Sequence, residues 1–112
     1  MAKVEIIRSL FEEIKKKFKG ETQNIIDLLE TLEENPYKGK AIGQVGGIAI
    51  KELRYDSFRF YFIVDEYKIR VFSKEELSNF LIKFVRMSDK KSQQETINEI
   101  RKILQQFGPQ EL

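Results

Sequence analysis

Histidine and cysteine are both absent from this 112-residue chain, and each absence removes whole classes of site. Without cysteine there are no disulfides and no thiolate metal ligands, although the cellular compartment stays open. Without histidine the chain lacks the most common general base near neutral pH and the most common zinc ligand. Catalysis must therefore use Arg, Lys, Tyr, Ser or carboxylate side chains. Mg²⁺ held by carboxylates is not excluded, but no acidic cluster has suitable spacing, so we expect no metal and no cofactor.

Long apolar runs are also missing. No stretch approaches the ~20 apolar residues that a membrane-spanning helix needs. No signal peptide precedes the polar residues 3–5. The length and a composition of 41% hydrophobic and 34% charged residues are typical of a soluble protein with one domain, residues 1–112. We therefore expect a cytoplasmic protein with no membrane contact.

A strong charge of one sign is lacking as well, because the net charge is only +2. That value is too small for general attraction to nucleic acid, so the distribution along the chain matters more. Residues 1–46 hold eight basic and eight acidic side chains, whereas residues 47–91 hold ten basic and seven acidic ones. The small positive excess therefore lies in the middle of the chain.

Apolar spacing divides the chain into helices and strands. Intervals of three and four residues predict three amphipathic helices. The first two lie at residues 6–18 and 22–34, and the last is capped by Ser88 or Ser92 and ends at Phe107. Residues 4–7 also fit a short strand, and the pattern leaves that choice open. Short β-forming runs predict four strands, at residues 48–54, 58–64, 68–73 and 80–87. The remaining segments are a glycine-rich loop over residues 36–47, tight turns at 55–57 and 65–66, and a polar connection at 74–79.

These elements predict an α+β fold in which one layer of helices packs against a sheet. An N-terminal helical hairpin would pack on a four-stranded, mainly antiparallel twisted sheet, and a C-terminal helix would follow.

The strand at residues 58–64 carries the most informative pattern. Because side chains of a strand alternate between faces, Arg59, Tyr61 and Ile63 should share one face and the neighbouring phenylalanines the other. A guanidinium group held in a central strand matches phosphate oxygens bidentately. A tyrosine two residues on adds a ring for stacking or a hydroxyl for hydrogen bonding. The strand therefore indicates a surface that binds a phosphodiester.

Other basic residues extend this candidate surface. Arg54, Arg86, Lys51 and Lys83 lie in or at the ends of predicted strands, and Lys90 and Lys91 precede the last helix. Two lysines beside the N-terminus of a helix are unfavourable for its dipole but suit an anion. Charged residues in strands are also typical of a solvated sheet face, and both interpretations stay open.

The order of elements and several local strings resemble the RelE/ParE superfamily of toxin–antitoxin toxins, in particular its HigB-like and phage Gp49-like branch. Residues 25–36 are similar to the second helix of the family and its proline turn, and Lys38-Gly39-Lys40 follows in the family manner. Glu52-Leu53-Arg54 and Phe58-Arg59-Phe60-Tyr61 resemble the family's central strands. Phe84 with Lys90-Lys91-Ser92-Gln93 resembles the segment that leads into its closing helix. The resemblance covers about residues 22–106.

The resemblance implies a toxin that cleaves mRNA on the ribosome without a metal and binds a cognate antitoxin protein. In that chemistry the RNA 2′-hydroxyl attacks the adjacent phosphate and clustered cations stabilise the transition state. Arg59 would hold the scissile phosphate, Arg54 and Arg86 would position the backbone, and Tyr61 would stack on a base or transfer a proton. Further phosphate contacts would come from Lys51, Lys83, Lys90 and Lys91.

The chain also departs from the family pattern. Enzymes of the RelE type carry two lysines on the strand before the central arginine, where this chain has Ile50 and Glu52. HigB-type members often use a histidine near the C-terminus, and this chain has none. A non-catalytic protein of the same fold, which inhibits a topoisomerase or only binds a partner, therefore stays open beside the enzyme. A small RNA-binding domain without toxicity is a third possibility.

Overall fold

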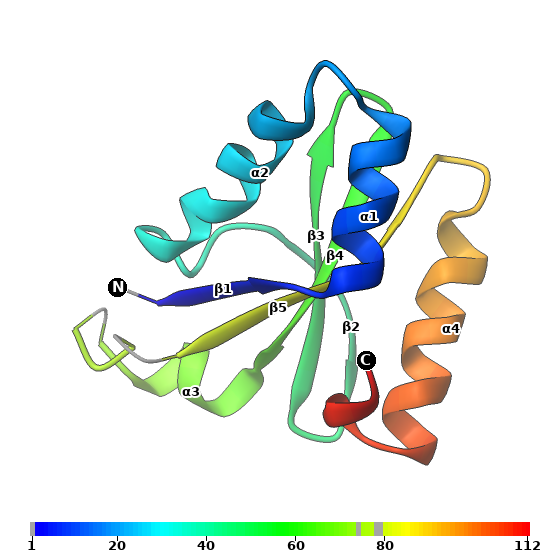
Figure 1. Ribbon diagram of the computed structural model, residues 1–112. Helices are drawn as coiled ribbons and strands as arrows, with labels where there is room; N and C mark the ends of the chain where they lie inside the picture. The colour runs from blue at the N-terminus through cyan, green and yellow to red at the C-terminus, as the bar shows by residue number, and fades with distance from the viewer. Residues whose placement is uncertain (1, 74, 78–79) are drawn as a thin grey trace.

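The computed structural model describes residues 2–73, 75–77 and 80–112 and contains a five-stranded sheet with helices on both of its faces (Figure 1). The α+β class expected from the sequence is confirmed. In chain order the elements are β1 (Lys3–Ile6), α1 (Arg8–Lys17), α2 (Thr22–Glu30), η1 (Thr31–Glu33), β2 (Lys40–Val45), β3 (Ile48–Tyr55), β4 (Phe58–Asp65), α3 (Glu66–Val71), β5 (Leu81–Ser88), α4 (Gln93–Gln106) and η2 (Pro109–Glu111).

The strands are arranged in the order β1-β5-β4-β3-β2. Neighbours from β2 to β5 run antiparallel, whereas β1 runs parallel to β5 at the edge. The three central strands lie within one residue of the ranges predicted from the sequence. Strand β4 is the middle strand of this order, as expected, and it is paired with a neighbouring strand on each side.

Side chains of β4 alternate between two separate hydrophobic clusters. Phe60 and Phe62 belong to the cluster under α1 and α2, whereas Tyr61 and Ile63 belong to the cluster under α4. The alternation predicted for this strand is correct. The prediction that the Tyr61 face is open to solvent is wrong along most of its length, because α4 covers it.

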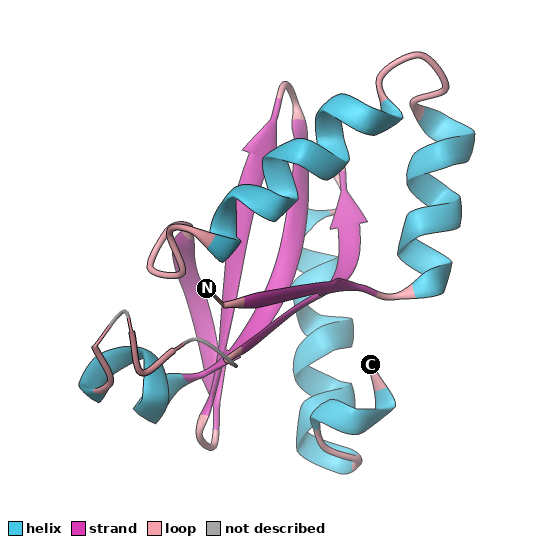
Figure 2. Cartoon of the chain, turned by 60° about the vertical axis from the view of Figure 1, so that its left-hand side comes forward, coloured by secondary structure: helices cyan, strands magenta, loops and turns pink. Residues whose placement is uncertain are grey.

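Helices α1 and α2 cover the first face of the sheet. Their buried residues recur at helical spacing, as the sequence predicts; they are Leu10 and Ile14 in α1 and Ile25 and Leu29 in α2. The two helices splay apart from their short connection at Gly20, so the expected hairpin is an open one (Figures 1 and 2).

Helix α4 packs on the opposite face through Ile97, Ile100 and Leu104. Figure 2 shows α4 on the far side of the sheet from α2. The molecule therefore has three layers instead of the single helix layer on a sheet that the sequence suggests. An apolar helical stripe shows that a helix packs on something, but it does not show which face of a sheet the helix covers.

The N-terminal segment adopts the strand alternative for its first residues. Backbone hydrogen bonds join Lys3 N to Phe80 O at 2.7 Å and Ile7 N to Phe84 O at 3.2 Å. These bonds add β1 to the edge of β5, and α1 begins only at Arg8. The sheet thus has two strands beyond the three central ones: β1, which the sequence leaves open, and β2, which lies within the segment that the sequence predicts to be a loop.

The predicted strand at residues 68–73 is wrong, and so is the hairpin turn at 65–66. Asp65 caps helix α3 by accepting a hydrogen bond from the Lys68 N–H at 3.0 Å. Ile69 and Phe72, three residues apart, pack against the core. The expected connection at residues 74–79 lies partly outside the described residues; within it Leu77 is buried.

Candidate functional site

Strands β3, β4 and β5 bring four of the expected site residues to one face of the sheet. Arg54 is paired in register with Arg59, and Tyr61 is paired with Arg86. Residues paired across neighbouring strands lie on the same face. The register between β4 and β5 shifts at a bulge that lies between Tyr61 and Phe62, beside Arg86. The face in question is the one that α4 covers.

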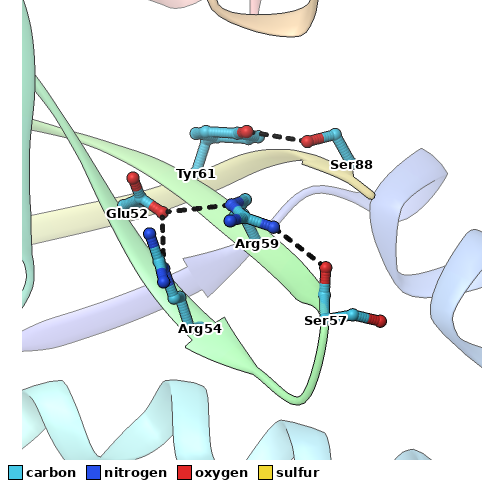
Figure 3. A network of polar contacts seen from close by, with 6 residues as sticks. All are labelled: Glu52, Arg54, Ser57, Arg59, Tyr61 and Ser88. Carbon is cyan, nitrogen blue, oxygen red and sulfur yellow. Dashed lines mark hydrogen bonds and ion pairs between the residues drawn. The ribbon is translucent and has the colours of Figure 1, made fainter. Parts of the chain in front are cut away.

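Glu52 lies between two of these arginines (Figure 3). Its Oε2 is 3.7 Å from Arg54 Nε and 3.8 Å from Arg59 Nε. Glu52 is 2% exposed and Arg59 is 6% exposed, whereas the side chain of Arg54 is 58% exposed. The central arginine therefore faces a buried carboxylate, and of this pair of arginines Arg54 is the one that offers its guanidinium group to solvent.

Arg59 is also held by the hairpin that precedes it. Its Nη1 donates a hydrogen bond to the backbone oxygen of Ser57 at 3.0 Å. The guanidinium group is thus turned toward the β3–β4 turn and toward Glu52 (Figure 3).

Tyr61 is a core residue, which is a correction to its expected place on an open surface. Its side chain is completely buried in the cluster under α4. Its hydroxyl shares a hydrogen bond of 2.7 Å with Ser88 Oγ (Figure 3). Burial raises the pKa of Tyr61, and the hydrogen bond with Ser88 offsets part of this effect. In this conformation the ring has no free face on which a base could stack.

Arg86 lies closer to the surface and contacts α4. Its Nε is 3.3 Å from Glu99 Oε1, and its Nη1 donates a hydrogen bond of 2.7 Å to the Val85 backbone oxygen. Like Arg54, this arginine is paired with a carboxylate. The Glu99 partner is exposed, so this pair is weak and easily exchanged.

Two of the expected phosphate-binding lysines lie away from the arginines, and Lys51 is the first. It is on the opposite face, where its Nζ donates a hydrogen bond to Tyr37 O at 3.2 Å and lies 5.9 Å from the centre of the Phe62 ring. Burial lowers the pKa of Lys51, and the charge of Glu66 opposes that shift. Strand parity explains the separation, since Lys51 alternates with Glu52.

Lys83 shares the α4 face but lies at its other end. It is in register with Ile63, four residues along β4 from Arg59, which corresponds to about 13 Å. Its Nζ is 3.5 Å from Pro109 O. Lys83 lines a largely apolar pocket of about 390 Å³ with Ile63, Leu81 and Pro109. It therefore does not join the arginines.

Lys90 and Lys91 are exposed in the β5–α4 connection. The pairing of Ser88 with Arg59 brings this connection to the end of the sheet where the arginines lie. Asp89 Oδ1 accepts a hydrogen bond of 2.8 Å from the backbone N–H of Ser92. The hydrogen bonds from Ser92 lower the pKa of Asp89, and the charge of Lys17 contributes a smaller part.

The same end of the molecule includes a basic residue that the sequence does not single out. Lys17, at the end of α1, lies 5.2 Å above the ring of Phe58 at the start of β4. Helical periodicity could only place it on a solvent face. Arg54, Lys17, Lys90 and Lys91 thus form a group of exposed cations around the β3–β4 turn, which we call the basic end.

Glu52 is the second residue that sequence reasoning does not place in the site. Strand parity contains the signal, since residues 52 and 54 of one strand share a face, and the tight turn at 55–57 puts that face beside Arg59 and Tyr61. Among the described residues there is no group of three acidic, histidine or cysteine side chains placed to hold a metal ion. The described helices include none long and apolar enough to cross a membrane.

Comparisons with known proteins find matches in structure but none in sequence. No protein-family model matches the chain. No curated protein matches it. Two solved structures do: a chain of the archaeal RelE–RelB complex from Pyrococcus horikoshii, and the isolated E. coli RelE toxin.

The archaeal structure aligns with a TM-score of 0.58 and 15% identity, and the alignment covers 80% of this chain and 94% of the other. For the E. coli toxin the TM-score is 0.50 and the identity 12%, with 89% and 99% covered. The chain has a RelE-like fold.

Proposed function

We propose that this chain is the toxin of a toxin–antitoxin pair and that it acts on RNA in the cytoplasm, as an endoribonuclease of ribosome-bound mRNA. One observation carries the proposal: within a RelE-like fold, Arg54, Arg59 and Arg86 occupy one face of three adjacent strands, next to the exposed Lys90 and Lys91. Clustered cations suit cleavage by an RNA 2′-hydroxyl, because they stabilise charge on the phosphate without a metal.

The exposures suggest an order of contacts. Arg54, Lys90 and Lys91 are open to solvent and would meet the RNA backbone first. Arg86 is half-buried and would exchange Glu99 for a phosphate. Arg59 is the deepest cation and would stabilise the scissile phosphate after Glu52 releases it. Tyr61 would act through packing that positions the strand, in place of the stacking role expected from the sequence.

An antitoxin partner is part of the proposal. One of the structures that share this fold is a RelE–RelB complex. We propose that a protein encoded beside this chain binds it and neutralises its basic end. The HigB-like branch of the superfamily stays a prediction from the sequence.

A second candidate function is a non-cleaving protein of the same fold, which binds a partner or inhibits a topoisomerase. The burial of Glu52 against Arg59, together with the burial of Tyr61, favours it. Such a protein would use the exposed basic end and leave the buried pair intact.

Induced expression in bacteria tests the proposal. We expect growth arrest with the wild-type chain and relief of arrest with Arg59→Ala. The variant needs a circular dichroism check of folding, because it leaves Glu52 without its buried partner. Arg70→Gln serves as the control, since Arg70 is an exposed arginine paired with Glu66 at 2.8 Å on α3. Full toxicity of a folded Arg59→Ala would reject the catalytic role, and stalled DNA replication without RNA cleavage would support the second candidate.

A further inference from the structure

The contact between Glu52 and its two arginines is unusually loose for a buried pair. One carboxylate oxygen is shared by two guanidinium groups, at 3.7 Å and 3.8 Å. Among the described residues, neither oxygen of Glu52 has a hydrogen-bond donor and Arg59 Nε has no acceptor. Buried polar atoms are usually hydrogen-bonded, so these three atoms need a physical explanation.

The long distances to the two arginines are specific to Glu52. The same chain forms a short ion pair between Arg70 Nε and Glu66 Oε1, at 2.8 Å, on an exposed helix. A carboxylate whose task is to anchor a buried arginine would be expected at a similar distance, in a bidentate arrangement. Glu52 instead lies between two arginines and is hydrogen-bonded to neither.

The group of three side chains also carries one positive charge in excess, because two guanidinium groups share one carboxylate. Desolvating charges is costly, and long contacts return little of that cost. An anion that offered oxygens to both arginines would satisfy the Arg59 donor that Glu52 leaves without a partner. Arg54, with its exposed side chain, gives such an anion a way in.

We propose that Glu52 is an internal counter-ion that occupies the place between Arg54 and Arg59 where a phosphodiester of RNA binds. The inference rests on the proposed action on RNA and adds a way in which RNA binding is regulated. Phosphate and carboxylate are both anionic and compete for the same two guanidinium groups, so RNA binds only as Glu52 is displaced. Glu52 thereby lowers the affinity of the site for RNA and sets how readily Arg59 becomes available.

Neutralising Glu52 while keeping its shape tests the inference. The ligand is a single-stranded 2′-O-methyl RNA oligonucleotide, which lacks the attacking hydroxyl and so cannot be cut by that route. Binding is measured by fluorescence anisotropy at several salt concentrations for the wild type and for Glu52→Gln. We expect about tenfold tighter binding and a salt slope steeper by about 0.7 for each additional phosphate that the variant neutralises.

Glu12→Gln is the matched control. It removes the same single negative charge from an exposed carboxylate on α1 that pairs with Lys15 and contacts none of the three arginines. We expect it to change the affinity by less than about threefold, because exposed pairs contribute little. Equal effects of the two substitutions would show that net charge alone is at work and would overturn the inference.

Glu52→Gln leaves Arg59 buried without a counter-charge, and its folding is checked by circular dichroism. A measurement on the wild-type protein covers the case in which the variant does not fold. The ¹³C signal of the Glu52 carboxylate and the ¹⁵N signals of Arg54 and Arg59 Nε are followed as the oligonucleotide is added. We expect all three to shift together. A shift at Arg54 alone, with Glu52 and Arg59 unchanged, would contradict displacement.

The outcome is separable from that of the proposed function, which depends on cleavage of unmodified mRNA. If the wild type cleaves mRNA but Glu52→Gln binds no more tightly, only the counter-ion role fails. If neither protein cleaves and Glu52→Gln still binds more tightly, the counter-ion role holds and the enzymatic proposal fails. If Glu52→Gln shows no increase in affinity for RNA under any condition, the inference is overturned.

Discussion

Tyr61 and Ser88 are joined by a hydrogen bond of 2.7 Å between two neighbouring strands beneath helix α4. Both residues are buried. Tyr61→Phe removes one hydroxyl and leaves the other without its partner, so we expect the free energy of unfolding to fall by about 1–2 kcal/mol in urea titrations. Tyr55→Phe is the control, because the hydroxyl of Tyr55 bonds the exposed Glu21. An equal loss of unfolding free energy in both variants would show that the buried hydrogen bond of Tyr61 contributes no more than the exposed one of Tyr55.

Gly39 occupies a backbone conformation that other residues rarely adopt, with φ at +108°. A Cβ at this position would lie 2.6 Å from Cζ of Phe62. Gly39→Ala should therefore lower the free energy of unfolding by about 2 kcal/mol or more through strain and displaced packing. Gly47→Ala is the control, since its Cβ would meet no described atom within 4 Å. Wild-type stability of Gly39→Ala would contradict the geometry of this turn.

Asp89 should contribute to stability in a pH-dependent way. Its pKa is lowered in the folded chain, first by the backbone hydrogen bond from Ser92. A lowered pKa gives stability that is present above the unfolded value, about 3.9, and is lost as the pH falls through the folded value.

We expect Asp89→Asn, which keeps an acceptor but not the charge, to melt below the wild type at pH 6. The two melting temperatures should converge as the pH falls below about 3.9. Asp27→Asn, on the exposed face of α2, controls for the loss of one negative charge. A gap between wild type and Asp89→Asn that stays constant down to about pH 2 would refute the assignment.

Lys90 and Lys91 should bind the RNA backbone without sequence preference. Replacing both by glutamine should weaken binding to single-stranded RNA uniformly and flatten the salt slope by about 1.4 in anisotropy titrations. Lys102→Gln, an exposed lysine within α4, is the control and should have little effect. If the double substitution leaves the slope unchanged, these lysines are solvated charges, which is the other interpretation that the sequence allows.

The three central strands of the sheet are predictable because their signal is local. Strands β3 and β4 alternate clearly between apolar clusters, and their observed bounds lie within one residue of the predicted ones. Helix α3 resembles a strand in sequence because Tyr67, Ile69 and Val71 also alternate with charged residues. The helix forms because Asp65 caps it and because Ile69 and Phe72, at helical spacing, reach the core. Capping and tertiary contact decide between two patterns that the same residues satisfy.

The strand face that Arg59 and Tyr61 share is predictable from the sequence, whereas its exposure is not. Which residues form the site stays a prediction. Parity correctly puts Arg59 and Tyr61 on one face, and the pairing of β3 with β4 adds Arg54 and Glu52 to it. That α4 covers this face depends on where the C-terminal helix docks, which no local pattern specifies. The burial of Tyr61 follows from that docking, whereas the pairing of Arg59 with Glu52 follows from the register of β3 and β4.

Cleavage of mRNA on programmed ribosomes by the purified protein tests the central claim most directly. If the protein acts as proposed, a defined mRNA is cut and the upstream fragment ends in a 2′,3′-cyclic phosphate, since the 2′-hydroxyl is the nucleophile. Arg59→Ala, shown to be folded, should cut about a hundredfold more slowly. Intact mRNA after prolonged incubation with active ribosomes would contradict the account.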